Sequence, residues 1–218
     1  MNATIAEQMV EIPVGSVVLQ GDLRIPPRPL GLVIFAHGSG SSRFSVRNRQ
    51  VAESLHVRGF ATLLMDLLTP EEESVDIYTT QYRFDVPRLA ARVTGAAEWA
   101  KTVPEVCDLP IGLFGASTGA AAALRAAADR PDLIAAVVSR GGRPDLAGQA
   151  LPRVSSPTLL IVGSADHPVI ELNRKAMRRM PAEVDLQIVA GATHLFEEPG
   201  TLEEVERLAG DWFGQYLD

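Results

Sequence analysis

The 218-residue sequence predicts a single-domain α/β protein built on an open, mostly parallel β-sheet with helices on both faces. Two observations predict this class. Short apolar runs lack polar alternation, as expected of parallel strands that are covered on both faces. Segments with helical periodicity lie between these runs, and an alternation of strands with helices is typical of doubly wound sheets. We therefore expect one α/β domain spanning residues 1–218.

The first predicted element is an N-terminal hairpin. Residues 10–14 and 17–25 alternate apolar and polar side chains around Gly15-Ser16, and the pattern stops at Pro26-Pro27. Alternation across a short turn indicates two antiparallel strands, which we place at the edge of the sheet.

The remaining elements follow in order along the chain. Buried strands are predicted at residues 32–36, 61–65, 111–114, 133–138, 159–162 and 184–189, and helices at residues 47–58, 86–102, 118–129, 169–179 and 202–216. Asp85 before Val86-Pro87 has the form of a helix N-cap and first turn. The connection over residues 68–82 shows no helix or strand pattern and contains Glu71-Glu72-Glu73. We interpret it as a solvated acidic loop rather than a flap over the substrate.

Composition excludes several functions. Twenty basic and 27 acidic residues give a net charge of −7, so we expect neither nucleic acid nor a membrane as partner. The single cysteine excludes an intrachain disulfide, and no Cys/His cluster has metal-ligand spacing, so no metal is expected. Residues 1–10 lack the pattern of a secretory signal, and no apolar run reaches the roughly 18 residues of a membrane span. These features predict a soluble, cytoplasmic protein.

The most informative motif is Gly115-x-Ser117-x-Gly119, which joins an apolar strand to an alanine-rich helix. A serine hydroxyl is a weak nucleophile, and a sharp strand-to-helix turn exposes it and directs it at a base. Glycines at both ends of the pentapeptide permit that turn. Ser117 is therefore the candidate nucleophile.

An acid and a base follow at later strand ends. Asp166 comes shortly after the strand that ends at Val162, and His194 follows the last predicted strand. A carboxylate there can orient an imidazole and stabilise its charged form. His167 is a weaker base candidate because it adjoins Asp166. The other residues considered are interpreted as structural: His37, His56 and Cys107.

The order Ser117, Asp166, His194 resembles that of the α/β-hydrolase superfamily, and in particular its small, lidless members similar to dienelactone hydrolase. The resemblance covers nearly the whole chain, although dienelactone hydrolase itself has a cysteine where this chain has Ser117. It implies that the loop His37-Gly38-Ser39-Gly40 donates a backbone N–H to the oxyanion, from Ser39 or else Gly38. The second implied donor is the N–H of Thr118. Only 19 residues separate the strand ending at Val138 from Thr158, too few for a helical cap.

Two arginines complete the candidate site. Arg140 and Arg143 flank Gly141-Gly142 after a predicted strand, where a guanidinium could hold an acidic group of the substrate. The alternative is an ordinary ion pair.

These residues together predict a serine hydrolase that cleaves a small carboxylic ester, thioester or lactone through an acyl-enzyme, without a cofactor. The expected partner is a small-molecule ester. Two alternatives stay open: acyl transfer to another acceptor, including peroxide, and a non-catalytic protein that keeps the fold as a ligand pocket.

Overall fold

A computed structural model of the chain describes residues 6–217. Its eight-stranded sheet has the order β1-β2-β4-β3-β5-β6-β7-β8. Only β1 with β2 and β2 with β4 pair antiparallel, and every other pair is parallel. The strands are β1 (Ala6–Val14), β2 (Val17–Ile25), β3 (Leu32–Ala36), β4 (Ala61–Met65), β5 (Ile111–Ala116), β6 (Ile134–Arg140), β7 (Thr158–Gly163) and β8 (Val184–Val189). This is the predicted class, an open α/β sheet with an antiparallel edge hairpin.

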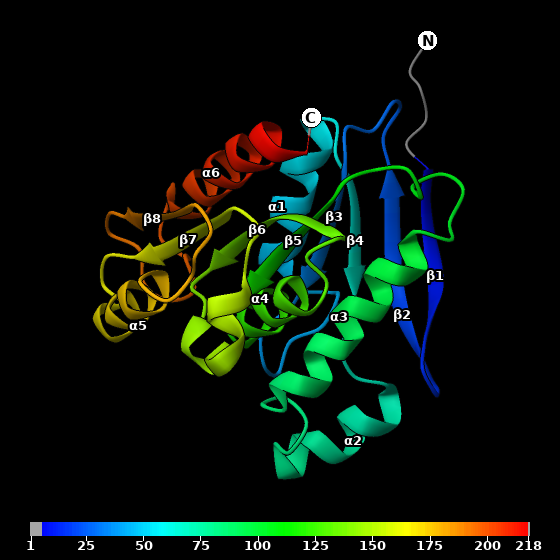
Figure 1. Cartoon of the computed structure of the whole chain (residues 1–218), viewed down its shortest axis with the longest axis horizontal. Helices are drawn as coiled ribbons and strands as arrows, with labels where there is room; N and C mark the ends of the chain where they lie inside the picture. Colours follow the sequence, from blue (N-terminus) through cyan, green and yellow to red (C-terminus); the bar gives the residue numbers. More distant parts are fainter. Residues whose placement is uncertain (1–5, 218) are drawn as a thin grey trace.

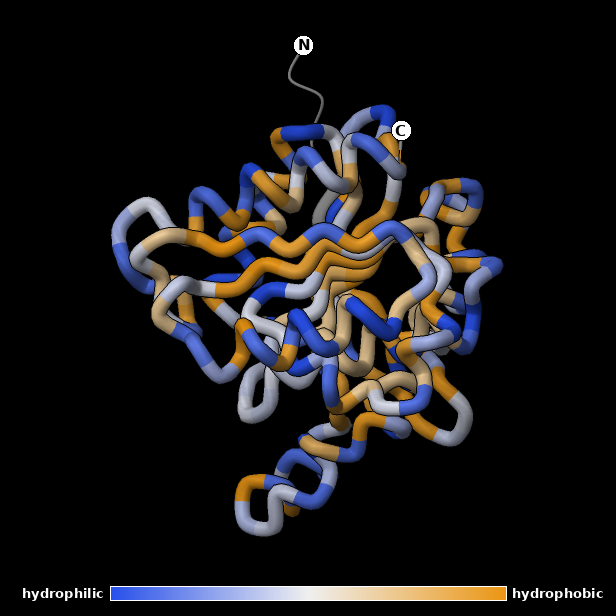
Figure 2. The backbone as a smooth tube through the Cα atoms, turned by 60° about the vertical axis from the view of Figure 1, so that its left-hand side comes forward, coloured by the Kyte–Doolittle hydropathy of each residue, from blue (hydrophilic) through white to orange (hydrophobic). Residues whose placement is uncertain are grey.

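Helices cover both faces of the sheet (Figure 1). Helices α1 (Val46–Val57) and α6 (Thr201–Tyr216) enclose one apolar core, while α3 (Val86–Ala100), α4 (Thr118–Asp129) and the end of α5 (His167–Met177) contribute to the other. Figure 2 shows the most hydrophobic segments running through the middle of the molecule, with mixed segments on either side. The two cores hold the strands in place. The carboxyl ends of the parallel strands therefore lie in fixed positions along one edge of the sheet.

The prediction of an unstructured loop over residues 68–82 is wrong, because α2 (Pro70–Thr79) lies within it. The Thr69 side chain accepts a hydrogen bond from the Glu72 N–H, and the Glu72 carboxylate accepts one from the Thr69 N–H. This reciprocal capping box satisfies two N–H groups at the start of the helix. Proline at the first helical position and the acidic first turn favour the helix further. Figure 1 shows α2 projecting beyond α3.

A second unpredicted element is the short 3-10 segment η1 (Pro144–Arg153). It is interrupted at Gly148, and its Ala147, Ala150 and Leu151 are buried in the core shared with α4. Because η1 packs against the body of the protein, it does not form a cap, and the expectation of a fold without a cap holds.

Part of the expectation about a secretory signal falls on residues 1–5, which lie outside the described residues. Across residues 6–217, none of the helices combines the length and the apolar character needed to cross a membrane.

Candidate active site

The candidate site lies at the carboxyl edge of the sheet, where parallel strands end side by side. Ser117 follows β5 directly, Arg140 is the last residue of β6, Asp166 lies three residues after β7, and His194 is in the loop after β8. Ligands of open α/β sheets bind at this edge. The fold therefore brings together residues that are far apart in the sequence.

Ser117 occupies a strained turn. Its φ of 51° and ψ of −120° are unusual for a residue with a side chain. Conformations of this kind cost on the order of 1–3 kcal/mol and persist where the surrounding structure imposes them. Here the Ser117 N–H donates to the Arg140 carbonyl at 3.2 Å, and the Arg143 N–H donates to the Ser117 carbonyl at 3.1 Å. The neighbouring strand β6 and the turn that follows it thus hold the serine in place.

The two glycines of the motif permit close backbone contacts. A Cβ on Gly115 would lie 2.4 Å from the Cα of Ala120, and a Cβ on Gly119 would lie 2.1 Å from the carbonyl oxygen of Ala36. Both distances are far below van der Waals contact. The glycines therefore let α4 pack directly against β5 and against the end of β3.

Ser117, His194 and Asp166 form a connected chain of side chains. The His194 Nδ1 lies 2.6 Å from the Asp166 Oδ2, and its Nε2 lies 3.4 Å from the Ser117 Oγ. A carboxylate accepts only, so a neutral imidazole carries its proton on Nδ1 and turns a free lone pair toward the serine. The Asp166 side chain is 13% exposed and that of His194 is 38% exposed. Asp166 is thus shielded from solvent, while the ring of His194 stays accessible.

The loop after β3 approaches the start of α4 at the expected oxyanion position. The Ser39 N–H donates to the Thr118 Oγ at 2.8 Å. The backbone donor implied for Ser39 is therefore engaged by a neighbouring hydroxyl in this structure, and a substrate oxygen would have to replace it. Sequence reasoning did not foresee this contact, which joins residues 79 positions apart.

His37 braces the same loop as a neutral imidazole. Its Nε2 accepts a hydrogen bond from the Leu67 N–H at 3.1 Å, which leaves Nδ1 to donate to the Gly38 carbonyl at 2.9 Å. Burial lowers the pKa of His37, although the Gly38 bond and the Asp66 charge partly oppose this effect. His37 thus ties the candidate oxyanion loop to the segment after β4.

A cavity of about 260 Å³ opens onto the serine, and its lining includes Ser39, Ser117, Arg140 and His194. Of the two arginines proposed from the sequence, only Arg140 lines it. The guanidinium of Arg143 instead makes two hydrogen bonds to the Asp145 carboxylate, each of 2.8 Å. Arg143 therefore forms the ion pair considered as the alternative.

Two further residues of this cavity escaped sequence reasoning. Arg47 and Asn48, in the first turn of α1, also line the cavity. The sequence carries no signal for them beyond their place soon after the loop that follows β3. In residues 6–217, no cluster of three or more His, Cys, Asp or Glu side chains is arranged to hold a metal ion.

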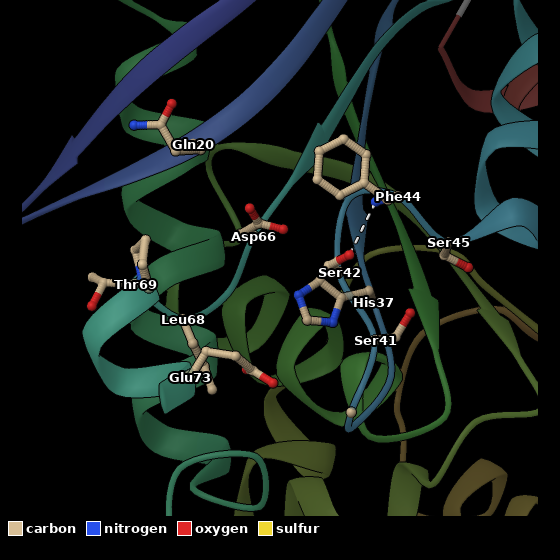
Figure 3. A pocket seen from close by; sticks show the side chains of 12 residues that line it. Gln20, His37, Ser41, Ser42, Phe44, Ser45, Asp66, Leu68, Thr69 and Glu73 are labelled. Carbon is tan, nitrogen blue, oxygen red and sulfur yellow. Dashed lines mark hydrogen bonds between the residues drawn. The ribbon is translucent and has the colours of Figure 1, made fainter. Parts of the chain in front are cut away.

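A larger cavity of about 520 Å³ adjoins the first and shares Ser41 and Ser45 with it. Figure 3 shows its polar side chains, which come from β2, from the loop after β3, from the segment after β4 and from α2. Its two acidic side chains are Asp66, whose carboxylate is paired with Arg43, and Glu73.

Solved structures of known proteins share this architecture. A dienelactone hydrolase from Anabaena variabilis matches with a TM-score of 0.96 and 54% identity, covering 98% of this chain and 99% of that one. Est1E from Butyrivibrio proteoclasticus matches with a TM-score of 0.79 and 18% identity, over 95% of this chain and 98% of that one. The second likeness is one of fold alone.

Curated relatives are longer than this chain. A protein of Mycobacterium tuberculosis named as a putative phosphoribosyl transferase is 55% identical over 211 residues, covering 97% of this chain and 47% of the relative. The chain thus spans about half the length of the curated relatives it matches. The model of the dienelactone hydrolase family matches residues 19–216. With its α/β-hydrolase fold and this match across almost its whole length, the chain belongs to the dienelactone hydrolase family.

Proposed function

We propose that the chain is a serine hydrolase that cleaves a small carboxylic ester, thioester or lactone through an acyl-enzyme. One observation carries the proposal: the hydrogen-bonded pair of Asp166 and His194 faces the hydroxyl of Ser117, which is held on a strained turn in the lining of a cavity. A nucleophile, a base and an orienting acid in that order have the geometry required for acyl transfer.

The steps follow from the contacts. The Nε2 of His194 takes the proton of Ser117 as its oxygen attacks the substrate carbonyl, and Asp166 stabilises the resulting imidazolium. His194 then passes that proton to the leaving group. A water molecule, activated by the same imidazole, hydrolyses the acyl-enzyme and frees Ser117. The 3.4 Å separation of Nε2 and Oγ closes with a small rotation when substrate binds.

The tetrahedral oxyanion needs donors, for which we propose the N–H groups of Ser39 and Thr118. The Ser39 N–H already points at a hydroxyl oxygen 2.8 Å away, the separation suited to an oxyanion. Rotation of the Thr118 side chain would free the Ser39 N–H to donate to the substrate oxyanion. One such donor is typically responsible for a rate factor of about 100–1,000.

The cavity dimensions favour small substrates. A volume of about 260 Å³ next to Ser117 suits a short acyl group, and the adjoining cavity of about 520 Å³ offers space for the other part of the ester. The name of the curated relatives describes proteins about twice as long as the matched region, so phosphoribosyl transfer is not carried over to this chain.

The test is a panel of short esters, thioesters and lactones assayed with three proteins: wild type, Ser117→Ala and Ser74→Ala. Ser74 is exposed on α2 and serves as the matched control. Loss of a triad serine costs on the order of a millionfold in turnover, so Ser117→Ala should be inactive while Ser74→Ala retains wild-type rates. If Ser117→Ala kept more than about a tenth of the wild-type rate, the proposal would be wrong.

A further inference from the structure

The loop that carries His194 lies between β8 and α6, and residues 190–199 form neither a helix nor a strand. Within this loop, Phe196 adopts a φ of 57°, a conformation that is unfavourable for a residue with a side chain. A reacting group must be held to within about 0.5 Å, and an irregular loop has no ladder of backbone bonds to do this. The position of the imidazole therefore depends on the individual contacts of the loop.

The first half of the loop is bound to the segment that carries Asp166. The Gly191 N–H donates to the Ser164 Oγ at 2.8 Å, and the Ala165 N–H donates to the Ala192 carbonyl at 3.0 Å. Ala192 is fully buried. These bonds fix the chain as far as residue 192, which leaves the next two residues, including the base, to be held from the other side.

The carboxylate of Glu198 supplies that second support. It accepts a hydrogen bond from the Thr193 N–H at 3.1 Å. Hydrogen bonds from the Thr193 hydroxyl and N–H, aided by the N–H groups of Glu198 and Glu197, hold the pKa of Glu198 below its ordinary value of 4.5. Glu198 is therefore ionised at neutral pH, and its bonds to Thr193 are those of a charged acceptor.

Glu198 is itself anchored to a buried helix end. Its carbonyl accepts hydrogen bonds from the Thr201 N–H at 3.1 Å and from the Thr201 hydroxyl at 2.7 Å. Thr201 is the first residue of α6 and is buried, and Phe196 is buried in the core beneath this helix. The side chain of Glu198 thus connects the fixed start of α6 to Thr193, the residue immediately before His194.

The distances around the imidazole show why this support matters. Its Nδ1 lies 2.6 Å from Asp166, but its Nε2 lies 3.4 Å from the Ser117 hydroxyl. Hydrogen bonds of good geometry end at about 3.2 Å, so a displacement of the loop by about 0.5 Å away from the serine would separate the two groups. Among the described residues, those that line the cavity at Ser117 do not include Glu198 or Thr193, so any effect of these residues passes through the loop.

We propose that Glu198, acting through Thr193, is a positioning residue that holds the His194 imidazole between Asp166 and Ser117. This inference rests on the proposed function, because the position of His194 limits the rate only if the imidazole takes the proton of Ser117. The bonds between Glu198 and Thr193 lie near the surface, so their removal should alter the reaction far more than the stability of the protein.

The first experiment separates the position of the base from substrate binding. The values of kcat and KM for 4-nitrophenyl butyrate are measured for wild type, Glu198→Ala and Glu198→Gln. The matched control is Glu203→Gln, since Glu203 is exposed in the first turn of α6. A misplacement of about 1 Å can cost about a hundredfold in rate, so Glu198→Ala should lower kcat by about tenfold to a hundredfold with KM unchanged. Glu198→Gln keeps one acceptor oxygen and should fall between.

These measurements can overturn the inference in two ways. A wild-type kcat in Glu198→Ala would show that the contact does not position the base, and an equal loss in Glu203→Gln would show that the effect is not specific to it. If wild type hydrolysed none of the esters, the proposed function would be wrong instead.

The second experiment asks whether Thr193 and Glu198 act as one unit. Thr193→Val removes the hydroxyl at nearly constant size and should lower kcat, and Thr193→Ser, which restores the hydroxyl, should lose less. Combining Thr193→Val with Glu198→Ala should cost no more than Glu198→Ala alone, because the two changes break the same contact. Losses that simply multiply in the double variant would contradict the inference.

The third experiment tests the contact without turnover. Amide hydrogen exchange is followed by mass spectrometry in the peptides that cover residues 190–198. Glu198→Ala should speed exchange in this segment, with little change in Tm or in the peptide that contains Ser117. Unchanged exchange would overturn the inference even in a protein that hydrolyses nothing. A large fall in Tm, with a wild-type kcat regained at a temperature where the variant is folded, would assign Glu198 a structural role only.

Discussion

Replacement of Gly119 by alanine tests whether close contact between the serine turn and the loop after β3 positions the candidate site. The new Cβ would lie 2.1 Å from the Ala36 carbonyl oxygen and 2.4 Å from that of His37, whereas ordinary contact begins at 3.4 Å. Both atoms belong to the backbone and no flexible side chain can move aside. Either α4 or the end of β3 must therefore retreat by more than 1 Å.

The expected magnitude follows from that displacement. Overpacking a well-filled site lowers stability by about 1–3 kcal/mol. A glycine-to-alanine change offsets at most about 1 kcal/mol of this loss, because it reduces the conformational entropy of the unfolded chain. A net loss of about 2 kcal/mol lowers the Tm of a chain this size by about 4–8 °C. Since a 1 Å misplacement can cost about a hundredfold in rate, kcat/KM should fall by about that factor.

The assay combines thermal unfolding with hydrolysis of 4-nitrophenyl butyrate. Gly214→Ala is the matched control, because Gly214 is exposed on α6 and its Cβ would meet nothing within 4 Å. The control should be neutral or stabilising by up to about 1 kcal/mol, with an unchanged rate. If Gly119→Ala matched wild type in both Tm and kcat/KM, the argument from backbone contact would be refuted.

Three further predictions follow. Asp166→Asn removes the charge 2.6 Å from the imidazole and should lower kcat/KM about 1,000- to 10,000-fold with little change in Tm, and a loss below tenfold would contradict its role. Burial lowers the pKa of His37 from its ordinary value of 6.5. As the pH falls below about 6.5, the folded protein therefore binds fewer protons than the unfolded chain. The free energy of unfolding, measured by urea titration, should thus fall as the pH drops from 7 to 5, and His37→Gln should weaken this dependence. If plots of unfolding free energy against pH ran parallel for wild type and His37→Gln, the effect assigned to His37 would be refuted. Thr69→Ala removes one half of the capping box and should lower the free energy of unfolding by about 1 kcal/mol, which corresponds to a Tm loss of about 2–4 °C. An unchanged Tm would contradict this prediction and show that α2 does not contribute to the cooperative unfolding.

Much of the fold could be predicted because the residues of each strand carry a pattern that indicates the strand. Residues 32–36 and 61–65 form β3 and β4 as expected, since uninterrupted apolar runs are buried on both faces. Helix α2 was missed for a local reason as well: its acidic first turn suggested solvation, while Thr69 followed three positions later by Glu72 is the pattern of a capping box.

The site was only partly accessible to sequence reasoning. The order of Ser117, Asp166 and His194 along successive strand ends was visible, and the structure places the three side chains in contact. Their catalytic roles remain the proposal. The surroundings of Arg140 were not visible, because its contact with Asn48 joins residues 92 positions apart across the sheet edge. The sequence also did not show which of the two arginines lines the cavity. Arg140 does so, while Arg143 forms an ion pair with the nearby Asp145.

The most direct test of the central claim is the reaction of the protein with a fluorophosphonate probe, followed by mass spectrometry of the digested chain. A serine activated by His194 should carry one adduct on the peptide containing Ser117, and the adduct should disappear in Ser117→Ala and form far more slowly in His194→Ala. An unlabelled wild-type protein, or labelling of Ser117 at the same rate without the histidine, would contradict the account.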